Sequence, residues 1–489
     1  MLSKTKKYWL ILSLFILFLG VRLYHLGYHD FWYDEIRTIE FAKNLWRNDR
    51  DAPLYYLLLR FWIKFFGTSE FIVRLPSAIL NFLSVVLTFF LGRKLFNLRV
   101  GLFAALLMGL SPFHLWYAQE ARDYNLAILL GVLSAYLFYK ADRKGSYGLW
   151  ASFALVSIAG LYTHYFYALL ILGQAFFILR RKTGLGFRRI APFLAIIFGF
   201  GLYLPRLLKK FSFSQNEIWI APPTLKSIII SLENFILGYN GSRALYLCAD
   251  TIAVILFITA LKGLSKKELK EPVLMCVFLF FLPLAAAFFF SRQFFPVYVD
   301  RRLIIFTPYL YLLLALGITC LGRRIRWALL SLLFFIFCIA GYNYFHDRLF
   351  MPFEHHLGAF IKKPFKPAVK FLEDNARSED ALAFTDISAM PSIKFYGRGQ
   401  LKNPYFFFDP RIPADIAWHR PRWKSIPLEK TKSLRVRKIW VVYANWARND
   451  KWDANTRSVK KWLERRYKQE LTKEFDGLYI VRYLKKWGP

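Results

Sequence analysis

The stretch DFWYDEIRTIEFAKNLW, Asp30–Trp46, places two adjacent carboxylates, Asp34 and Glu35, a few residues after a long apolar run. That run, Tyr8–Gly20, approaches the roughly 20 residues that cross a bilayer as a helix. Ionisable side chains beside a membrane crossing are costly unless they face protein or water, so they are functional candidates by default. What they do depends on what the rest of the chain builds around them.

The composition is that of a polytopic membrane protein. The 489 residues carry a formal net charge of +36, and 56% of them are hydrophobic, which fits neither an ordinary soluble domain nor a disordered chain. Further apolar runs follow one another, among them Leu75–Leu91, Val100–Leu110 and Leu303–Leu321. A single cleaved signal peptide is therefore excluded.

The basic connectors predict the orientation, because short loops rich in Lys and Arg stay on the cytoplasmic side. The chain begins MLSKTKK, so we expect a cytoplasmic N-terminus. With about 11 spans, five basic connectors all fall on that face: 93–94, 142–144, 180–189, 262–270 and 322–326. Asp30–Trp46 then lies outside the cytoplasm. The expected spans are 8–24, 76–92, 100–116, 125–140, 149–163, 166–180, 190–205, 246–262, 272–290, 303–321 and 327–344.

Two segments outside the cytoplasm are predicted to contain helices. In the outer loop 25–75, EIRTIEFAKNLW and PLYYLLLRFWIKFF combine apolar residues at helical spacing with Arg and Lys, as in helices that lie in the membrane interface. In 206–245, TLKSIIISLENFIL is expected to do the same, although this segment could also form an extra pair of short spans.

After a transmembrane domain at 1–344, the pattern predicts a small α/β domain at 345–489. PAVKFLEDNA, SAMPSIKFYG and SVKKWLERRY are typical of helices, and ALAFTD, KIWVVYA and LYIVRYL of strands. An odd number of spans makes this domain extracytoplasmic. Its 30 Lys and Arg against 16 Asp and Glu favour anionic membrane lipids or glycans as partners over nucleic acid.

Two other polar clusters are expected on the outer side. SPFHLWYAQEARDY, between the third and fourth spans, contains Glu120, Arg122 and Tyr124, and LYTHYFYALL, between the fifth and sixth, contains His164. Arg301 and Arg302 precede the tenth span. Arginine at such positions can bind phosphate oxygens through its planar fork of N–H donors.

The order of five motifs resembles a known family. WYDEIRT, PLYYLLLRFW, GTSEFIVRLPSAI, SPFHLWYAQEARDY and LYTHYFYALL follow one another as in bacterial polytopic glycosyltransferases related to protein O-mannosyltransferases and to lipid A aminoarabinose transferase, which share the GT-C fold. The resemblance covers about residues 20–180. It implies transfer of a sugar from a polyprenyl-phosphate donor to a hydroxyl acceptor on protein, lipid or glycan, at the outer face of the cytoplasmic membrane.

The resemblance also implies roles for particular residues. Asp34 would be the general base that removes the acceptor proton in an inverting displacement, and Glu35 occupies a position where the family often has a second acid. The chain departs from the family in DAPLYY, because Asp51 and Ala52 precede Pro53 where relatives commonly have His-Pro. Positive charge for the departing phosphate would come from Arg122 and from Arg301 or Arg302.

Simpler interpretations remain open for each of these residues. Asp34 and Glu35 could cap a helix, Glu120 and Arg122 could form an ion pair that closes a turn, and Tyr124 could anchor the membrane interface. His164, Arg301 and Arg302 could be ordinary rim residues. All eight histidines fall on the predicted outer side, which leaves a divalent metal open as a cofactor, although no HExxH-like spacing assigns a metal-binding residue.

The sequence thus predicts an all-α membrane protein of the GT-C type, with about 11 transmembrane helices and a C-terminal extracytoplasmic α/β domain. A lipid-linked sugar flippase or transporter is the alternative. Transporters tend to carry internal repeats and charges at the bilayer midplane. The polar clusters here lie at the predicted outer ends of the spans, which favours surface chemistry.

Overall fold

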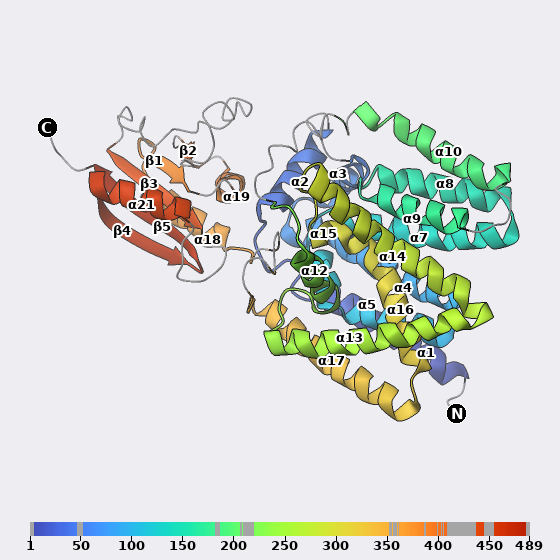
Figure 1. The fold of residues 1–489 in the computed structure, drawn as a ribbon. Helices are drawn as coiled ribbons and strands as arrows, with labels where there is room; N and C mark the ends of the chain where they lie inside the picture. Colours follow the sequence, from blue (N-terminus) through green and yellow to red (C-terminus); the bar gives the residue numbers. More distant parts are fainter. Residues whose placement is uncertain are drawn as a thin grey trace. The chain divides into compact units, whose positions relative to one another are not determined.

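The apolar runs form helices throughout the N-terminal two thirds of the chain, as the computed structural model shows (Figure 1). The residues that it describes are 4–45, 52–180, 186–205, 208, 220–351, 355, 359, 361–385, 388–398, 400–401, 403, 405–407, 437–444 and 454–485. The departure from the family at Asp51 and part of the segment 206–245 lie outside these residues. The chain divides into two units, Met1–Leu26 with Phe41–Ala359, and Gly27–Glu40 with Phe360–Pro489.

The first unit consists of helices, and each predicted span overlaps one or more of them. Their bounds are α1 Lys4–Leu23, α3 Leu54–Phe66, α4 Glu70–Leu95, α5 Leu98–Leu110, α6 Pro112–Ala118, α7 Tyr124–Lys144, α8 Tyr147–Leu161, α9 Tyr167–Leu179, α10 Phe187–Gly201, α12 Leu225–Leu237, α13 Arg243–Leu261, α14 Lys267–Gln293, α15 Asp300–Leu303, α16 Thr307–Cys320 and α17 Arg323–Phe345.

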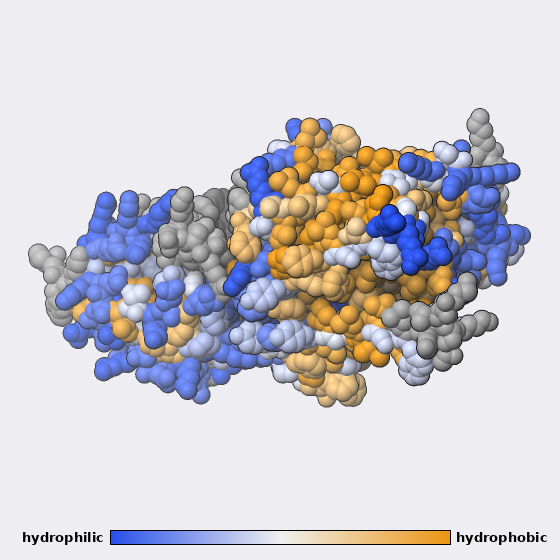
Figure 2. All heavy atoms as spheres, turned by 90° about the horizontal axis from the view of Figure 1, so that it is seen from below, coloured by the Kyte–Doolittle hydropathy of each residue, from blue (hydrophilic) through white to orange (hydrophobic). Residues whose placement is uncertain are grey.

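Within the described residues, six of these helices are long and apolar enough to cross a membrane, or seven if the bent pair α5–α6 counts as one span. Three shorter apolar helices, Ile11–Leu23, Tyr147–Leu161 and Tyr167–Leu179, coincide with other expected spans. Figure 2 shows the apolar surface of this unit, on which Phe65, Leu155 and Phe198 are exposed as lipid-facing residues would be. The total of about 11 crossings stays a prediction.

The predicted third span, 100–116, is not one straight helix. α5 ends at Leu110 and α6 starts at Pro112, with an angle of 60° between them. The cause is local: Pro112 lacks a backbone N–H and is suited to the first helical position, while Ser111 caps the new helix by accepting the N–H of His114 at 3.3 Å. This bend aims the following turn, Gln119–Asp123, across the ends of the neighbouring helices.

Small residues allow the helices of this unit to approach closely. A methyl group on Gly317 of α16 would overlap the carbonyl oxygen of Leu256 on α13, and one on Gly92 of α4 would lie 2.8 Å from the Cα of Gly101 on α5. Membrane helices commonly pack through such small residues, because lipid tails provide no hydrophobic drive for helix association.

The second unit contains a five-stranded mixed sheet in the order β2-β1-β3-β5-β4. The strands are β1 Ala381–Phe384, β2 Tyr405–Phe407, β3 Lys438–Ala444, β4 Tyr467–Phe475 and β5 Leu478–Lys485, and the helices are α18 Phe365–Asn375, α19 Ala389–Tyr396 and α21 Ala454–Arg466. β1 pairs in parallel with β2 and β3, and β5 pairs antiparallel to β3 and β4.

Helices cover both faces of the sheet, so successive side chains along a strand pack into two different cores. Leu382, Trp440 and Ile480 pack in one core with residues of α18 and α19, and Ala383 and Val441 pack in the other with residues of α21. The three helices and three of the strands were predicted from the sequence. β2 and β4 were not, and β4 is joined to β5 by Asp476 and Gly477, whose φ angles of 46° and 78° suit a tight hairpin turn.

The close crossing of α13 and α16 gives a stability prediction. Gly317→Ala should lower the apparent free energy of unfolding by about 1–3 kcal/mol, because the methyl group must push the two helices apart. Gly341→Ala is the matched control, since no atom lies within 4 Å of a methyl group at that helical position, and it should be neutral or stabilising by up to about 1 kcal/mol. Thermal unfolding of the detergent-purified protein measures both, and equal midpoints for the two variants would contradict the packing argument.

Candidate functional site

The acidic stretch forms a loop and the start of helix α2, Tyr33–Lys43, with Asp34 and Glu35 in its first turn. Helix N-termini favour negatively charged side chains there. Residues 27–40 belong to the second unit, together with the α/β sheet. The sequence pattern predicts this stretch within the domain 1–344. Residues 27–40 instead pack with a segment more than 300 residues away, which chain order alone cannot show.

The two adjacent carboxylates have different surroundings. Glu35 is completely buried, and its Oε2 lies 3.8 Å from the Nζ of Lys362, whose side chain is 9% exposed. Asp34 is only partly buried, and the Oγ1 of Thr38 donates to its backbone carbonyl at 2.8 Å. Glu35 is therefore part of a buried ion pair, whereas the Asp34 side chain remains accessible to solvent.

In the first unit, the predicted polar turn between α6 and α7 is buried almost throughout. Glu120 accepts a hydrogen bond from the indole N–H of Trp116 at 3.0 Å. The guanidinium of Arg122 lies 5.7 Å from the ring centroid of Tyr124, the first residue of α7. Glu120 thus has a structural partner on α6, and Arg122 is partly exposed.

His164 lies beside this turn, as the sequence pattern suggested. Its ring centroid is 5.7 Å from that of Tyr124, and it stacks on Tyr165 at 5.0 Å. The backbone N–H of Phe166 donates to its Nδ1 at 3.2 Å. Arg122, Tyr124 and His164 therefore form one row, in which Nδ1 of the histidine is engaged by its own turn.

Arg301 and Arg302 lie in the single turn α15 and have different orientations. Arg302 Nη1 donates to the carbonyl of Val297 at 3.1 Å. Arg301 is 7% exposed and follows Asp300, whose Oδ1 accepts the backbone N–H of Arg301 at 2.7 Å. Of the two arginines, Arg302 is the more exposed, and its guanidinium is held by its own loop.

A chain of tyrosines connects the two arginine-bearing regions. The ring of Tyr117 lies 5.4 Å from Tyr124, and its hydroxyl is hydrogen-bonded to that of Tyr239 at 2.5 Å. Tyr239 also hydrogen-bonds Asp300. Burial, with Asp300 nearby, raises the pKa of Tyr239 well above its ordinary value, so this hydroxyl stays protonated. The structure thus joins the turn near Arg122 to α15.

Asn234 on α12 belongs to the same cluster, and sequence reasoning missed it. Its Nδ2 donates to Oδ2 of Asp300 at 2.8 Å and to the carbonyl of His355 at 2.7 Å. The neighbouring Glu233 lies 3.2 Å from Nε2 of His355, and burial raises the pKa of its carboxyl. The available signal was the polar pair Glu233-Asn234 inside the otherwise apolar segment IIISLENFIL.

A second missed feature is the buried polar network beneath the turn. Arg22 of α1 is completely buried; it donates to the carbonyls of Phe18 and Gly109 at 2.8 and 2.9 Å, and its Nε donates to Oδ1 of Asn81 at 2.7 Å. Asn81 in turn contacts His114, whose Nε2 lies 2.8 Å from the hydroxyl of Thr307. The bond to Gly109 satisfies a carbonyl at the end of α5, which the bend leaves without a helical partner.

The possibility of a divalent metal finds no support in side-chain geometry. Over the part of the chain that the structure describes, no three His, Cys, Asp or Glu residues lie together as a metal site would need.

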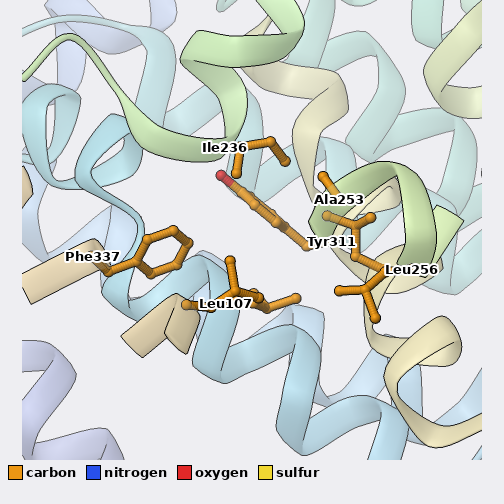
Figure 3. Close-up of a pocket in the computed structure, with 8 residues that line it drawn as sticks. Leu107, Ile236, Ala253, Leu256, Tyr311 and Phe337 are labelled. Carbon is orange, nitrogen blue, oxygen red and sulfur yellow. The ribbon is translucent and has the colours of Figure 1, made fainter. Parts of the chain in front are cut away.

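An apolar pocket lies elsewhere in the first unit, between α5, α12, α13, α16 and α17 (Figure 3). The hydroxyl of Tyr311 is turned away from its apolar lining, because it donates to the carbonyl of Phe235 at 2.6 Å. The lining residues are Leu107, Ile236, Ala253, Leu256, Tyr311, Leu314, Leu333 and Phe337. A surface of this kind suits a hydrocarbon chain and offers no polar group for catalysis.

Comparison with known proteins defines the class. Residues 50–208 match the family model of dolichyl-phosphate-mannose-protein mannosyltransferase. The structure of ArnT from Cupriavidus metallidurans in the apo state is similar over 98% of both chains, with a TM-score of 0.64 at 13% identity, and the form bound to undecaprenyl phosphate gives 0.60, also at 13% identity and over 98% of both chains. No curated protein sequence matches.

A more distant similarity extends to an archaeal enzyme. Oligosaccharyltransferase AglB from Archaeoglobus fulgidus, in complex with an inhibitory peptide and a dolichol-phosphate, matches with a TM-score of 0.52 at 12% identity, over 98% of this chain and 74% of that one. The chain has the GT-C fold of polytopic membrane glycosyltransferases. The predicted resemblance to the protein O-mannosyltransferase-like group is confirmed by the family match and the fold.

Proposed function

We propose that the chain is a glycosyltransferase of the cytoplasmic membrane that moves a sugar from a polyprenyl-phosphate donor to a hydroxyl acceptor on its outer face. The contrast within the acidic stretch carries the proposal: Glu35 is consumed by a buried ion pair, while Asp34, one residue away, keeps a partly exposed carboxylate at a helix N-terminus. The family match and the GT-C fold support the reaction class.

Asp34 acts as the general base in this proposal. The acceptor oxygen attacks the anomeric carbon, its proton passes to the Asp34 carboxylate, and the bond to the phosphate oxygen breaks with its electron pair staying on the polyprenyl phosphate. Attack from the face opposite the leaving group inverts the anomeric configuration. Such positioned proton transfer contributes about 10²- to 10⁴-fold to a rate.

Arg122 supplies positive charge for the departing phosphate, and Tyr124 and His164 order the surface beside it. Arg122 is the exposed member of the row that these three residues form, and a planar guanidinium can bind two phosphate oxygens at once. Arg301 supports the same region through the Asp300–Tyr239–Tyr117 chain. Glu120 has a structural role on this account, since it bonds Trp116.

We place part of the polyprenyl chain against the helices that line the apolar pocket, whose volume of about 10 Å³ requires these helices to move apart before a hydrocarbon chain can enter. The pocket lining is entirely hydrocarbon apart from the engaged tyrosine (Figure 3). ArnT has been crystallised with undecaprenyl phosphate, which is a ligand of this chemistry. The sugar and the acceptor are not specified by these features.

The base assignment predicts the behaviour of Asp34→Asn. The rate at which the protein forms its glycosylated product in membranes of the source strain should fall by about 10²-fold or more, because the amide cannot take the proton. Affinity for undecaprenyl phosphate should stay within about twofold. Asp374→Asn, the same exchange at an exposed acid on α18, is the control and should retain full activity. Near-normal turnover of Asp34→Asn would remove the base from the mechanism.

The phosphate assignment predicts the behaviour of Arg122→Lys. A point charge replaces the planar fork, so affinity for undecaprenyl phosphate should weaken by about tenfold. Arg93→Lys, at an exposed position at the end of α4, should leave the affinity unchanged. Binding can be followed by native mass spectrometry or by thermal shift in detergent. An unchanged affinity for Arg122→Lys would exclude this arginine from phosphate binding.

The tail assignment predicts the behaviour of Ala253→Phe. The added ring would fill the apolar pocket, and affinity for undecaprenyl phosphate should weaken by about tenfold. Val254→Phe changes the next residue, which is 56% exposed on the outer face of α13, and should bind normally. If both variants bind the carrier as the wild type does, its chain lies elsewhere.

A further inference from the structure

The segment that carries Asp34 is fixed at its start by α18. The backbone N–H of Lys366 donates to Oδ2 of Asp30 at 2.7 Å, and the Nζ of Lys366 lies 3.6 Å from Oδ1. Lys366 is in the first turn of α18, whose preceding residue, Pro364, makes no side-chain cap. Asp30 therefore caps this helix from a distant part of the sequence, which also holds the backbone at residue 30.

The next residue is held by α19 on both sides of its peptide backbone. The N–H of Phe31 donates to the hydroxyl of Tyr396 at 2.7 Å, and its carbonyl accepts from Oγ of Ser392 at 3.4 Å. The ring of Phe31 is completely buried and packs edge-on against Phe395 at 5.7 Å. Residues 30 and 31 are thus attached to two helices of the α/β unit.

One contact lies immediately beyond Asp34. It is the buried ion pair of Glu35 with Lys362. Lys362 precedes α18 in the chain, so the pair ties the first turn of α2 to the segment that leads into the sheet. Asp34 therefore lies between anchors on both sides, and all of them come from the α/β unit.

We infer that Lys362, acting through Glu35, is a positioning residue for Asp34, and that the α/β unit serves to hold the base. The inference rests on the proposed function, because it gives Asp34 a task that needs exact placement. A general base must lie within hydrogen-bond reach of the acceptor hydroxyl, and a misplacement of about 1 Å can reduce a rate by about 10²-fold. A buried ion pair contributes little net stability but defines one geometry, which suits this role.

Removal of the anchoring charge gives the first test. Lys362→Met should reduce the rate of product formation in membranes of the source strain by about 10²-fold, while affinity for undecaprenyl phosphate stays within about twofold. Lys370→Met, an exposed lysine on α18, is the matched control and should behave as wild type. A Lys362→Met protein with full activity overturns the positioning role.

Exchanging the charges of Glu35 and Lys362 distinguishes loss of positioning from general unfolding of the protein. Lys362→Glu alone places two carboxylates together in a buried site and should abolish product formation. The double variant Glu35→Lys with Lys362→Glu restores an ion pair of opposite polarity and should recover at least about tenfold of the lost rate. Absence of any recovery, with both proteins folded by size-exclusion chromatography, counts against a specific pair.

Hydrogen–deuterium exchange provides a readout that does not depend on activity. In purified Lys362→Met, peptides covering 27–40 should exchange faster than in wild type, while those of β3 and β5 should not change. Unchanged exchange in 27–40 overturns the anchor itself. Asp34→Asn in the same activity assay separates the two proposals: if it is inactive while Lys362→Met is fully active, only the positioning inference fails, and if Asp34→Asn is active, the proposed function fails.

Discussion

The hydrogen bonds of Arg22 are the interaction on which the helical unit depends. A buried guanidinium in a transmembrane helix is costly unless its donors are engaged, and this one donates to carbonyls of α1 and α5 and to Asn81 of α4. Because Arg22 donates to the carbonyl of Gly109 at the end of α5, the 60° bend at Ser111 does not leave that carbonyl without a hydrogen bond. The bend in turn directs α6 and the polar turn, so the positions of Arg122 and Tyr124 follow from a residue that contacts neither in the described network.

Three nearby carboxylates in the second unit have different surroundings. Asp30 caps α18, Glu35 is neutralised in a buried pair, and Asp34 keeps its carboxylate partly exposed. The first two fix the backbone on either side of the third. The α/β unit is rigid enough to hold such a segment, because helices pack closely on both faces of its sheet.

The sequence predicted the helices well, because their signal is local. Each expected span overlaps helical residues, although 100–116 is divided between α5 and α6. KIWVVYA forms β3 with the expected bounds, since long apolar runs and buried strands are visible in a single window. β4 was missed because its sequence, YKQELTKEF, is mostly polar: it is an edge strand with one exposed face, and only the Asp476-Gly477 turn after it was a signal.

The site was predictable only in part, for the same reason. The motif order singled out Asp34, Arg122, Tyr124 and His164, and the structure brings the last three into one row. Nothing local shows that Glu35 is buried and paired, because its partner Lys362 lies more than 300 residues later in the chain. The hydrogen bond between Asn234 and Asp300 was likewise unpredictable, because it joins two helices that are far apart in the sequence.

The most direct measurement of the central claim compares three source strains that are otherwise identical: wild type, a deletion, and Asp34→Asn expressed at the normal level. Mass spectrometry of total lipids, surface glycans and exported proteins identifies any sugar that is lost and the class of molecule that loses it. The account predicts that the deletion and Asp34→Asn lose the same sugar from the same class. A profile that changes only in the deletion would contradict it, and would favour transport of a lipid-linked sugar without transfer.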